Sequence, residues 1–421
     1  MDIKLLKHTA RNSFALMLVV IVISIVISKD TQSMIYANSA DNQRLNLDTQ
    51  NISIQNIESN NSSNQNINNL EIIKDKTVFS DPSEIQLGDK YLIIKNLNKS
   101  TDNVTIQDLY MSRSIRITIT GLEEEIFNDG SLVRINRGKE YSGIPEMELE
   151  GLLQTSSMGL LKGNSKVSES PLIITDVDAD SDPVKEYKIQ YSKNNNSNLY
   201  TARMDISLDR IYGYILYQDE ENIYIDLRRP KDVYDKIVVI DPGHGGTDGG
   251  AFSKDEEYFE KDINLSIALY LKELLDKKDL KVYYTRTSDQ TVYLNPRVYL
   301  ANEVEADFFL SIHCNANESP QPNGCEVLFN ELQNDDGIKT KEFAKICLEE
   351  LTNITQKVNR GLVNGNDMII IQKAEMPTAL AEVAFMSNEV EMKFLRKEEN
   401  RKNIAIALEK VIERAYVELE P

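Results

Sequence analysis

Two histidines and one glutamate stand where their side chains could do chemistry together. The chain has three histidines; His8 lies near the N-terminus, whereas His244 and His313 each follow a short apolar run. Glu382 lies inside the apolar run LAEVAF at 380–385. An ionised carboxylate in such a strand needs a hydrogen-bonding partner, a metal ion or a proton. Imidazoles and carboxylates are ligands of catalytic zinc, which keeps one position for water. Spacing alone leaves a metal site and two structural histidines as open interpretations.

The segment 236–251, KIVVIDPGHGGTDGGA, places His244 in a glycine-rich turn. Its residues 237–240 predict a strand buried on both faces, and Asp-Pro-Gly ends that strand. Asp248 stands where a dinucleotide-binding fingerprint needs glycine, and the chain has no GKS or GKT phosphate loop. Open α/β folds build their sites at the carboxyl edge of the sheet. We therefore expect His244 at such an edge.

Predicted strands and helices alternate through the C-terminal half of the chain. Such alternation is typical of an α/β fold with a mostly parallel sheet flanked by helices. Parallel strands would bring His244 and His313 to the same edge of that sheet. The predicted strands are 237–240, 280–285, 307–312, 325–329 and 380–385. Four helices are predicted: one that is capped by Asp262, one that is capped by Asn295 and ends at Glu303, and two that span 337–351 and 400–417.

A different pattern, period-two alternation of apolar and polar residues, fills residues 71–230. It predicts an antiparallel, β-rich domain, sandwich-like, that precedes the α/β domain. Its exposed tyrosines either bind sugar or peptide or cover the edge of the core. Residues 229–231 are expected to be the linker to the next domain. The alternating runs are 114–120, 186–191 and 222–228, with shorter apolar runs at 132–135, 172–177 and 211–217.

The first 70 residues are predicted to deliver and tether the protein rather than to fold. Basic residues precede an apolar run at 14–27, so residues 1–37 read as a signal peptide or, if uncleaved, a membrane anchor. Residues 38–70 are rich in Asn and Ser and are expected to be a disordered tether. Both interpretations predict an extracytoplasmic protein, secreted or associated with the cell wall or membrane. Contact with the membrane would be through the N-terminal segment only.

Composition excludes several other classes of protein. The chain has 421 residues and a formal net charge of −20, which argues against nucleic acid as a partner. The three cysteines, Cys314, Cys325 and Cys347, form no CxxC pair, so neither a disulfide framework nor a zinc ribbon is expected. The sequence has no GxSxG motif for a serine hydrolase.

Four segments together resemble one known family. They are 236–250, 260–265 (EKDINL), 306–316 (ADFFLSIHCNA) and 377–388 (PTALAEVAFMSN). In this order they are similar to the zinc-dependent N-acetylmuramoyl-L-alanine amidases of bacterial cell walls, with an amidase type 3 catalytic domain. The resemblance covers nearly all of 234–421, the expected catalytic domain. It says nothing firm about residues 38–230, although a β-rich module before such a domain is often wall-targeting.

The resemblance implies a function and a set of site residues. His244, Glu260 and His313 would hold one Zn²⁺ ion, and Glu382 would be the catalytic carboxylate. The substrate would be peptidoglycan, cleaved at the amide between N-acetylmuramic acid and L-alanine. Without the resemblance, Glu260 would read as a solvated carboxylate in an acidic run. Strand alternation points Cys314 away from the side of His313, so we expect it to pack in the core.

The resemblance leaves two other functions open and carries one expectation about partners. The protein could be a catalytically inactive wall-binding adaptor, or a zinc peptidase or deacetylase acting on another wall amide. Some relatives carry a long helix after the second histidine that plugs the site until an activator removes it. Here only residues 314–323 separate His313 from the next predicted strand. We therefore expect no activator protein.

Overall fold

The computed structural model describes residues 52–54, 87–95, 103–142, 145, 181–219, 221–336 and 339–421. The predicted signal peptide or anchor, 1–37, and the predicted run at 172–177 lie outside the described residues. So does the predicted tether, 38–70, except that Ile52–Ile54 form a short strand, β1. Their Ile-Ser-Ile alternation suits pairing with a neighbouring strand, which explains this difference from a disordered tether. Among the described helices, none is long and apolar enough to cross a membrane.

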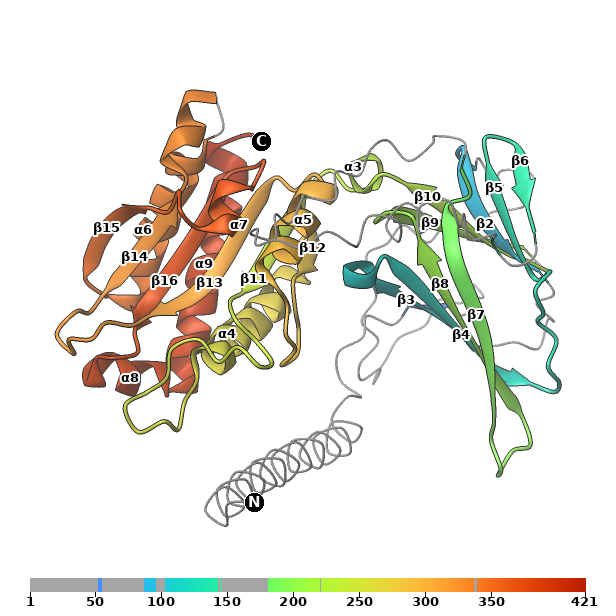
Figure 1. Cartoon of the computed structure of the whole chain (residues 1–421), viewed down its shortest axis with the longest axis horizontal. Helices are drawn as coiled ribbons and strands as arrows, with labels where there is room; N and C mark the ends of the chain where they lie inside the picture. The colour runs from blue at the N-terminus through green and yellow to red at the C-terminus, as the bar shows by residue number, and fades with distance from the viewer. Residues whose placement is uncertain are drawn as a thin grey trace, which may run out of the picture. The chain divides into compact units, whose positions relative to one another are not determined.

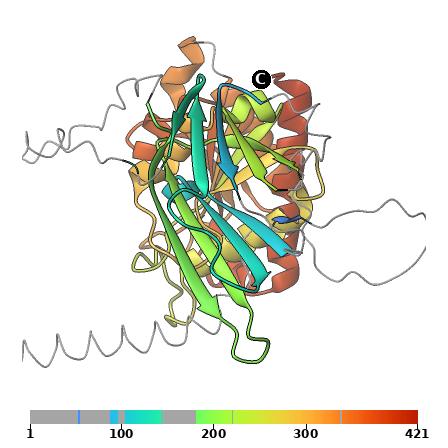
Figure 2. The ribbon, with the colours of Figure 1, turned by 90° about the vertical axis from the view of Figure 1, so that its right-hand side faces the viewer.

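The described residues before position 229 form two antiparallel sheets of five strands each. Figures 1 and 2 show the long green strands β7 and β8 side by side in the first sheet. The first sheet has the order β1, β3 (Asn103–Leu109), β4 (Ser114–Leu122), β8 (Tyr200–Leu208) and β7 (Val184–Lys193). The second has the order β6 (Lys139–Tyr141), β5 (Leu132–Asn136), β2 (Lys90–Ile94), β10 (Ile223–Arg228) and β9 (Gly213–Gln218).

Alternating side chains give these two sheets a common core. In β4, Ile115, Ile117 and Ile119 are buried, and the residues between them are partly exposed. These isoleucines belong to one hydrophobic cluster with Leu92 and Ile94 of β2, in the other sheet. The period-two pattern therefore predicted these strands correctly, because each strand buries one side.

The predicted linker between β10 and the next sheet includes a short helix. Pro230–Val233 form one turn of helix, α3. Pro230 is its first residue, where a ring-fixed φ angle favours a helical start and the missing N–H costs nothing. The turn buries Pro230 and Val233.

The C-terminal part contains a six-stranded sheet, visible as adjacent arrows in Figure 1. Its strands coincide with the predicted ones, with one addition, β15, whose sequence NRGLVN lacks alternation. The strand order is β12 (Lys281–Tyr284), β11 (Ile237–Pro242), β13 (Phe308–Asn315), β16 (Thr378–Phe385), β14 (Cys325–Phe329) and β15 (Asn359–Asn364).

This sheet is mixed. Strands β12, β11, β13 and β16 are parallel to one another, and β15 is parallel to β14. Strand β14 runs antiparallel to β16. Residues 316–324, which join β13 to β14, contain no helix, and a return without a crossover helix reverses the strand direction. The carboxyl ends of β11 and β13 lie at one edge, as expected for His244 and His313.

Helices cover both faces of the sheet. Residues of α4, α6 and α9 share one hydrophobic cluster with one face of the strands, and residues of α5 and α7 share another cluster with the opposite face. The helices are α4 (Glu260–Leu275), α5 (Leu294–Glu303), α6 (Thr340–Thr355), α7 (Ile369–Gln372), α8 (Glu389–Leu395) and α9 (Glu398–Glu418); short 3₁₀ turns span Tyr110–Ser112 and Glu331–Asp336.

Two predicted helix caps are wrong. Helix α4 begins at Glu260 rather than after a cap on Asp262, because Phe259 is still in an extended bridge with Phe252. Asp262 lies in the first turn, where a negative charge interacts favourably with the helix dipole. Helix α5 begins at Leu294, so Asn295 is also inside the first turn. Its side-chain oxygen accepts a hydrogen bond from the Nζ of Lys373 instead of capping the helix.

Candidate metal centre

His244 is held in place by the glycine loop after β11. Its backbone has a φ of 61°, in the left-handed region that few non-glycine residues adopt. Its ring Nδ1 lies 2.8 Å from Oδ2 of Asp248, and its Nε2 lies 3.2 Å from Oε2 of Glu260. A carboxylate at Nδ1 fixes the ring orientation and leaves Nε2 as the nitrogen that faces the other site residues.

Glu260 is a buried carboxylate at the first position of α4. Its Oε2 accepts a hydrogen bond of 2.8 Å from the backbone N–H of Ala251. Its Oε1 accepts bonds of 3.1 Å from the N–H of Cys314 and 3.2 Å from the side-chain amide of Asn264. The helix start, with its positive end of the dipole, also favours this negative charge. The solvated interpretation of Glu260 is therefore wrong.

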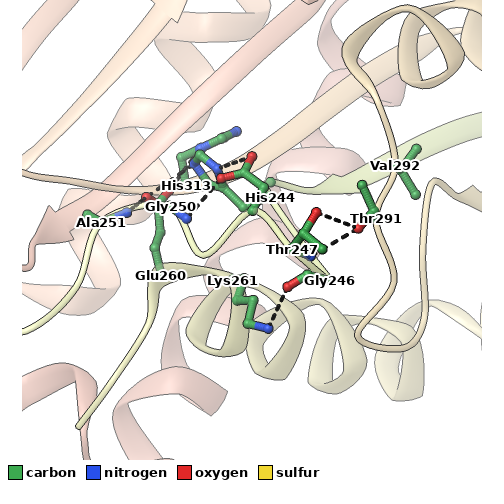
Figure 3. Close-up of polar contacts among 12 residues, drawn as sticks. His244, Gly246, Thr247, Gly250, Ala251, Glu260, Lys261, Thr291, Val292 and His313 are labelled. Atoms are coloured by element: carbon green, nitrogen blue, oxygen red, sulfur yellow. Dashed lines mark hydrogen bonds and ion pairs between the residues drawn. The ribbon is translucent and has the colours of Figure 1, made fainter. Parts of the chain in front are cut away.

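His313 completes the group from the neighbouring strand, β13. Its Nδ1 lies 2.9 Å from Oε1 of Glu260, and the centroids of the two histidine rings are 4.9 Å apart. Figure 3 shows His244, Glu260 and His313 converging from the loop, α4 and β13. One donor atom from each of the three lies within 4.8 Å of the others. The structure thus brings together all three residues that were predicted as metal ligands.

Glycine is required where the loop passes this group. A Cβ atom on Gly243 would lie 2.2 Å from the ring of His313. A Cβ on Gly250 would lie 2.6 Å from Oε2 of Glu260 and 2.7 Å from Cδ2 of His244, and its φ is +65°. These close approaches explain why the loop is rich in glycine. Because the loop passes so closely, the two imidazoles and the carboxylate form a compact donor set, which fits a zinc ion.

The pKa values of His244 and Glu260 depend on their neighbours in the site. Burial alone would lower the pKa of His244, but the hydrogen bonds to Glu260 and Asp248 outweigh it and raise the pKa to about 9. Burial alone would raise the pKa of Glu260, but the two imidazoles outweigh it and hold the pKa well below its usual range. Without a metal ion, the group therefore carries a carboxylate beside at least one imidazolium. A cation that binds there replaces protons.

Glu382 lies beside this group in β16. It is directly opposite His313 of β13 in the strand register. Its Oε2 is buried and has no hydrogen-bond partner among the residues that the structure describes. Burial raises the pKa of Glu382 to about 7; the nearby His313 opposes the rise, and the carboxylates of Glu260 and Glu326 add to it. Such a group exchanges protons readily near neutral pH.

Two buried arginines donate hydrogen bonds to the backbone of the loop that carries His244. Sequence reasoning missed both of them. Arg297 donates hydrogen bonds to the carbonyls of Pro242 and His244 and forms an ion pair of 2.7 Å with buried Asp241. Arg286 donates to the carbonyls of Pro242 and Gly243. Their signal in the sequence is weak, since each is a single charge near polar residues. Only the fold shows that both point at the loop's carbonyl groups.

A second set of contacts holds the outer side of the loop. Thr247 donates its backbone N–H to Oγ1 of Thr291, at 3.0 Å, and Lys261 donates from Nζ to the carbonyl of Gly246, at 2.9 Å (Figure 3). Lys261 also forms an ion pair of 2.7 Å with Asp289. Residues from α4 and from the segment before α5 thus hold the loop at Gly246 and Thr247.

Other polar and sulfur groups near the site have structural roles. Cys314 is buried in the hydrophobic core, as strand alternation predicted. Asn388 caps α8, where its side chain accepts hydrogen bonds from the N–H groups of Val390 and Glu391. Asn315 donates a hydrogen bond of 2.6 Å to Glu326 of β14. Among these groups, only Asn315 reaches a residue opposite Glu382.

Known proteins are similar to the part of the chain that contains this site. The family model described as N-acetylmuramoyl-L-alanine amidase matches residues 238–414. The germination-specific N-acetylmuramoyl-L-alanine amidase of Bacillus subtilis (strain 168) is 31% identical over 197 residues, which cover 44% of this chain and 81% of that protein. The uncharacterized protein YqiI of the same strain is 33% identical over 182 residues, covering 43% of this chain and 85% of YqiI.

Solved structures are also similar to part of the chain, and one of them serves as an example. The catalytic domain of CwlV, an N-acetylmuramoyl-L-alanine amidase from Bacillus (Paenibacillus) polymyxa var. colistinus, is 32% identical and covers 43% of this chain and 98% of that one, with a TM-score of 0.41. From the family match and the two relatives, the chain belongs to the N-acetylmuramoyl-L-alanine amidases, which are hydrolases whose substrate is peptidoglycan.

Proposed function

We propose that this protein hydrolyses the amide bond between N-acetylmuramic acid and L-alanine in peptidoglycan, with one zinc ion held by His244, Glu260 and His313. The observation that carries the proposal is the donor set itself: three donor atoms within 4.8 Å of one another. Family membership supports a peptidoglycan amide as the bond that is cut. The choice of zinc rests on two imidazoles and one carboxylate, a ligand set that suits a catalytic zinc ion.

Each residue of the site has a distinct part in this reaction. A bound zinc ion supplies Lewis-acid chemistry, since it polarises a carbonyl group and lowers the pKa of water. Asp248 keeps the ring of His244 in one orientation through Nδ1, and Ala251 and Cys314 orient Glu260 through their N–H groups. Arg297 and Arg286 fix the backbone that carries His244. The donor set is therefore preorganised.

Glu382 is the proposed catalytic carboxylate. Its Oε2 is buried and has no hydrogen-bond partner in the described part of the chain, and its pKa is about 7; both support a role as general base and then as general acid. It would take a proton from the attacking water and pass it to the nitrogen of L-alanine. The carbon–nitrogen bond of the amide then breaks, leaving a carboxylate on the lactyl group and a free amine on the stem peptide.

The remaining parts of the chain fit a protein that acts outside the cytoplasm. We propose residues 234–421 as the catalytic domain and 71–230 as an accessory, wall-targeting domain. In this proposal, residues 1–37 act as a signal peptide or anchor and 38–70 as a tether. The apolar run behind basic residues near the N-terminus supports export, and peptidoglycan as the family's substrate supports a location in or near the wall.

We also propose that the enzyme needs no activator. The segment between β13 and β14, residues 316–324, is a short connection without a helix that could cover the site. The purified, zinc-loaded protein should therefore cleave purified peptidoglycan by itself. Inactivity that is relieved only by adding a second protein from the producing cell would contradict this proposal.

The test of the reaction is to identify the group that is released. Purified peptidoglycan is incubated with the protein, and newly formed amino termini are labelled and identified. N-terminal L-alanine is expected with wild type, is lost with a chelator, and returns with zinc. The variant Glu382→Gln should be slower by roughly 100-fold to 10,000-fold, in the range of general acid–base catalysis. The control Glu389→Gln, at an exposed residue of α8, should match wild type.

The same experiment separates the alternatives. Another amino terminus would indicate a peptidase, and released acetate would indicate a deacetylase. If no amine appears but the protein sediments with the peptidoglycan, the protein is a wall-binding adaptor.

A further inference from the structure

A row of four charged or titratable side chains crosses the sheet away from the metal centre. His313 of β13 is opposite Glu382 of β16, and Glu382 is opposite Glu326 of β14. Residues in register on neighbouring strands point to the same face of a sheet. The row ends at Arg360 on the edge strand β15, whose Nε lies 2.8 Å from Oε2 of Glu326. Arg360 is therefore the cation of a row that contains the proposed catalytic carboxylate.

The local backbone places Arg360 at an irregular point of its strand. The register between β14 and β15 shifts between Cys325 and Val327, opposite the pair Arg360 and Gly361. Gly361 has a φ of +94°, a conformation that glycine adopts freely. Irregularities of this kind bend an edge strand and change the direction of a side chain. The Arg360 side chain is about a third exposed, at 35%.

The guanidinium of Arg360 is anchored on two sides. Its Nε donates to Glu326, and its Cζ lies 4.8 Å from the centroid of the ring of Phe385 in β16. Glu326 is itself fixed, because its other oxygen, Oε1, accepts the 2.6 Å bond from Asn315. These contacts use one N–H and the flat face of the guanidinium. Arginine has four further N–H donors on its terminal nitrogens, and no described residue accepts from them.

An exposed ion pair usually contributes little to stability, so stability is a weak reason for this arrangement. A guanidinium held by Nε and by an aromatic ring presents its remaining edge in a fixed direction. That edge matches a carboxylate, which it binds with two parallel hydrogen bonds. The site therefore suits an anionic group on a substrate that passes over Glu382 toward the sheet edge.

We propose that Arg360, positioned by Glu326, binds the carboxylate of the stem-peptide residue that follows L-alanine. This inference rests on the function proposed above. In the stem peptide that residue is a glutamate joined through its γ-carboxyl group, so its α-carboxylate is free unless it is amidated. The enzyme would then prefer peptidoglycan with the free carboxylate over peptidoglycan with the carboxamide. The peptide would lie over β14 and β15.

The test compares two soluble disaccharide–peptide substrates that differ only in this group, one with the carboxylate and one with the carboxamide. Wild type should show a kcat/KM about 10-fold to 100-fold higher for the carboxylate, the range of hydrogen bonds to charged groups. Arg360→Met should lose this preference by lowering kcat/KM for the carboxylate substrate alone, mainly through KM. Arg360→Lys should keep part of it.

The control is Arg414→Met, which removes another ion-paired, partly exposed arginine, on α9. It should leave both rates unchanged. Equal rates of wild type on the two substrates, or an equal loss on both with Arg360→Met, would overturn the inference. If wild type cleaves neither substrate nor intact peptidoglycan, the proposed function fails instead. The comparison of the two substrates with wild type needs no variant, so a folding defect in Arg360→Met cannot hide the result.

Discussion

At the scale of single residues, the centre combines groups whose charges depend on one another. Glu260 is buried between two imidazoles, and beside them the Oε2 atom of Glu382 is buried without a hydrogen-bond partner among the described residues. The same burial that makes an isolated carboxylate costly raises the pKa of Glu382 toward neutrality, which suits its proposed role as a proton carrier. The pKa of Glu260 is held low and that of Glu382 is raised to about 7. The pKa values of the two glutamates thus move in opposite directions because their partners differ.

The raised pKa of Glu382 predicts a pH-dependent cost to stability. In the folded protein it is about 7, above the ordinary value of 4.5. Below pH 4.5 the carboxyl group is neutral in both folded and unfolded states and costs nothing. Between pH 4.5 and 7 the unfolded state ionises first, so the free energy of unfolding falls as pH rises.

Above pH 7, Glu382→Gln should therefore be more stable than wild type by roughly 3 kcal/mol, from 1.36 kcal/mol per pKa unit. Denaturant unfolding in the presence of a chelator measures this difference at pH 4 and pH 8. The exposed substitution Glu389→Gln serves as control. A difference between Glu382→Gln and wild type that is the same at both pH values would contradict the prediction.

The partner of His244 predicts an effect on metal affinity. Asp248 accepts a hydrogen bond from Nδ1 of His244 and also from the N–H of Gly250. Asp248→Asn keeps the size of the side chain but removes its charge, so the ring should bind the metal less well. We expect zinc affinity to fall by roughly 10-fold to 100-fold, as is typical for such outer partners. Competition with a chromophoric chelator measures it; an unchanged affinity would show that Asp248 is only a surface group.

At the scale of elements, the loop between β11 and α4 forms the site because its glycines let the chain pass close to the ligands. Gly250→Ala should disturb the site directly, since its Cβ would lie 2.6 Å from Oε2 of Glu260 in a left-handed backbone. We expect at least a tenfold loss of zinc affinity, with the far-ultraviolet circular dichroism of the fold retained.

Gly249→Ala is the matched control for this loop. Its Cβ would meet the ring of Phe259 at 3.1 Å, and it does not touch the ligands. It should bind zinc nearly as wild type does. If Gly250→Ala and Gly249→Ala bind zinc equally well, crowding at the ligands is not the reason for glycine at position 250.

Much of the fold could be predicted from the sequence, and the reasons are local. Strands such as β11 are continuous apolar runs, and β4 alternates cleanly, so burial is visible in the order of residues. His244 and His313 could be placed at one edge because both follow such strands. Glu260 could be predicted as a metal ligand only from the resemblance to a family. Its position in an acidic run does not distinguish it from its solvated neighbours.

The features that were missed depend on contacts distant in sequence. The antiparallel direction of β14 shows in no local pattern, because the residues of β16 that pair with it lie more than fifty residues away. Helix α4 starts at Glu260 because of a bridge between Phe252 and Phe259. The support of the loop by Arg286 and Arg297 involves carbonyl groups more than forty residues away. Such contacts leave almost no periodic signal.

At the scale of the whole molecule, the negative net charge predicts that binding to cell walls depends on salt concentration. With a formal net charge of −20, the chain is repelled by anionic polymers attached to a wall. At about 10 mM ionic strength, where screening extends over about 30 Å, more protein should sediment with walls stripped of such polymers than with intact walls. The difference should vanish near 150 mM salt. Stronger binding to intact walls at low salt would indicate a specific anionic receptor.

In the proposed reaction, one zinc ion at His244, Glu260 and His313 supports amide cleavage. The most direct measurement titrates zinc into metal-free protein while recording both bound metal and the release of N-terminal L-alanine from peptidoglycan. Activity should rise in proportion to bound zinc and reach its maximum at one ion per chain. His313→Ala should bind zinc far more weakly and stay inactive. Full activity in the metal-free protein, or unchanged zinc binding by His313→Ala, would contradict the account.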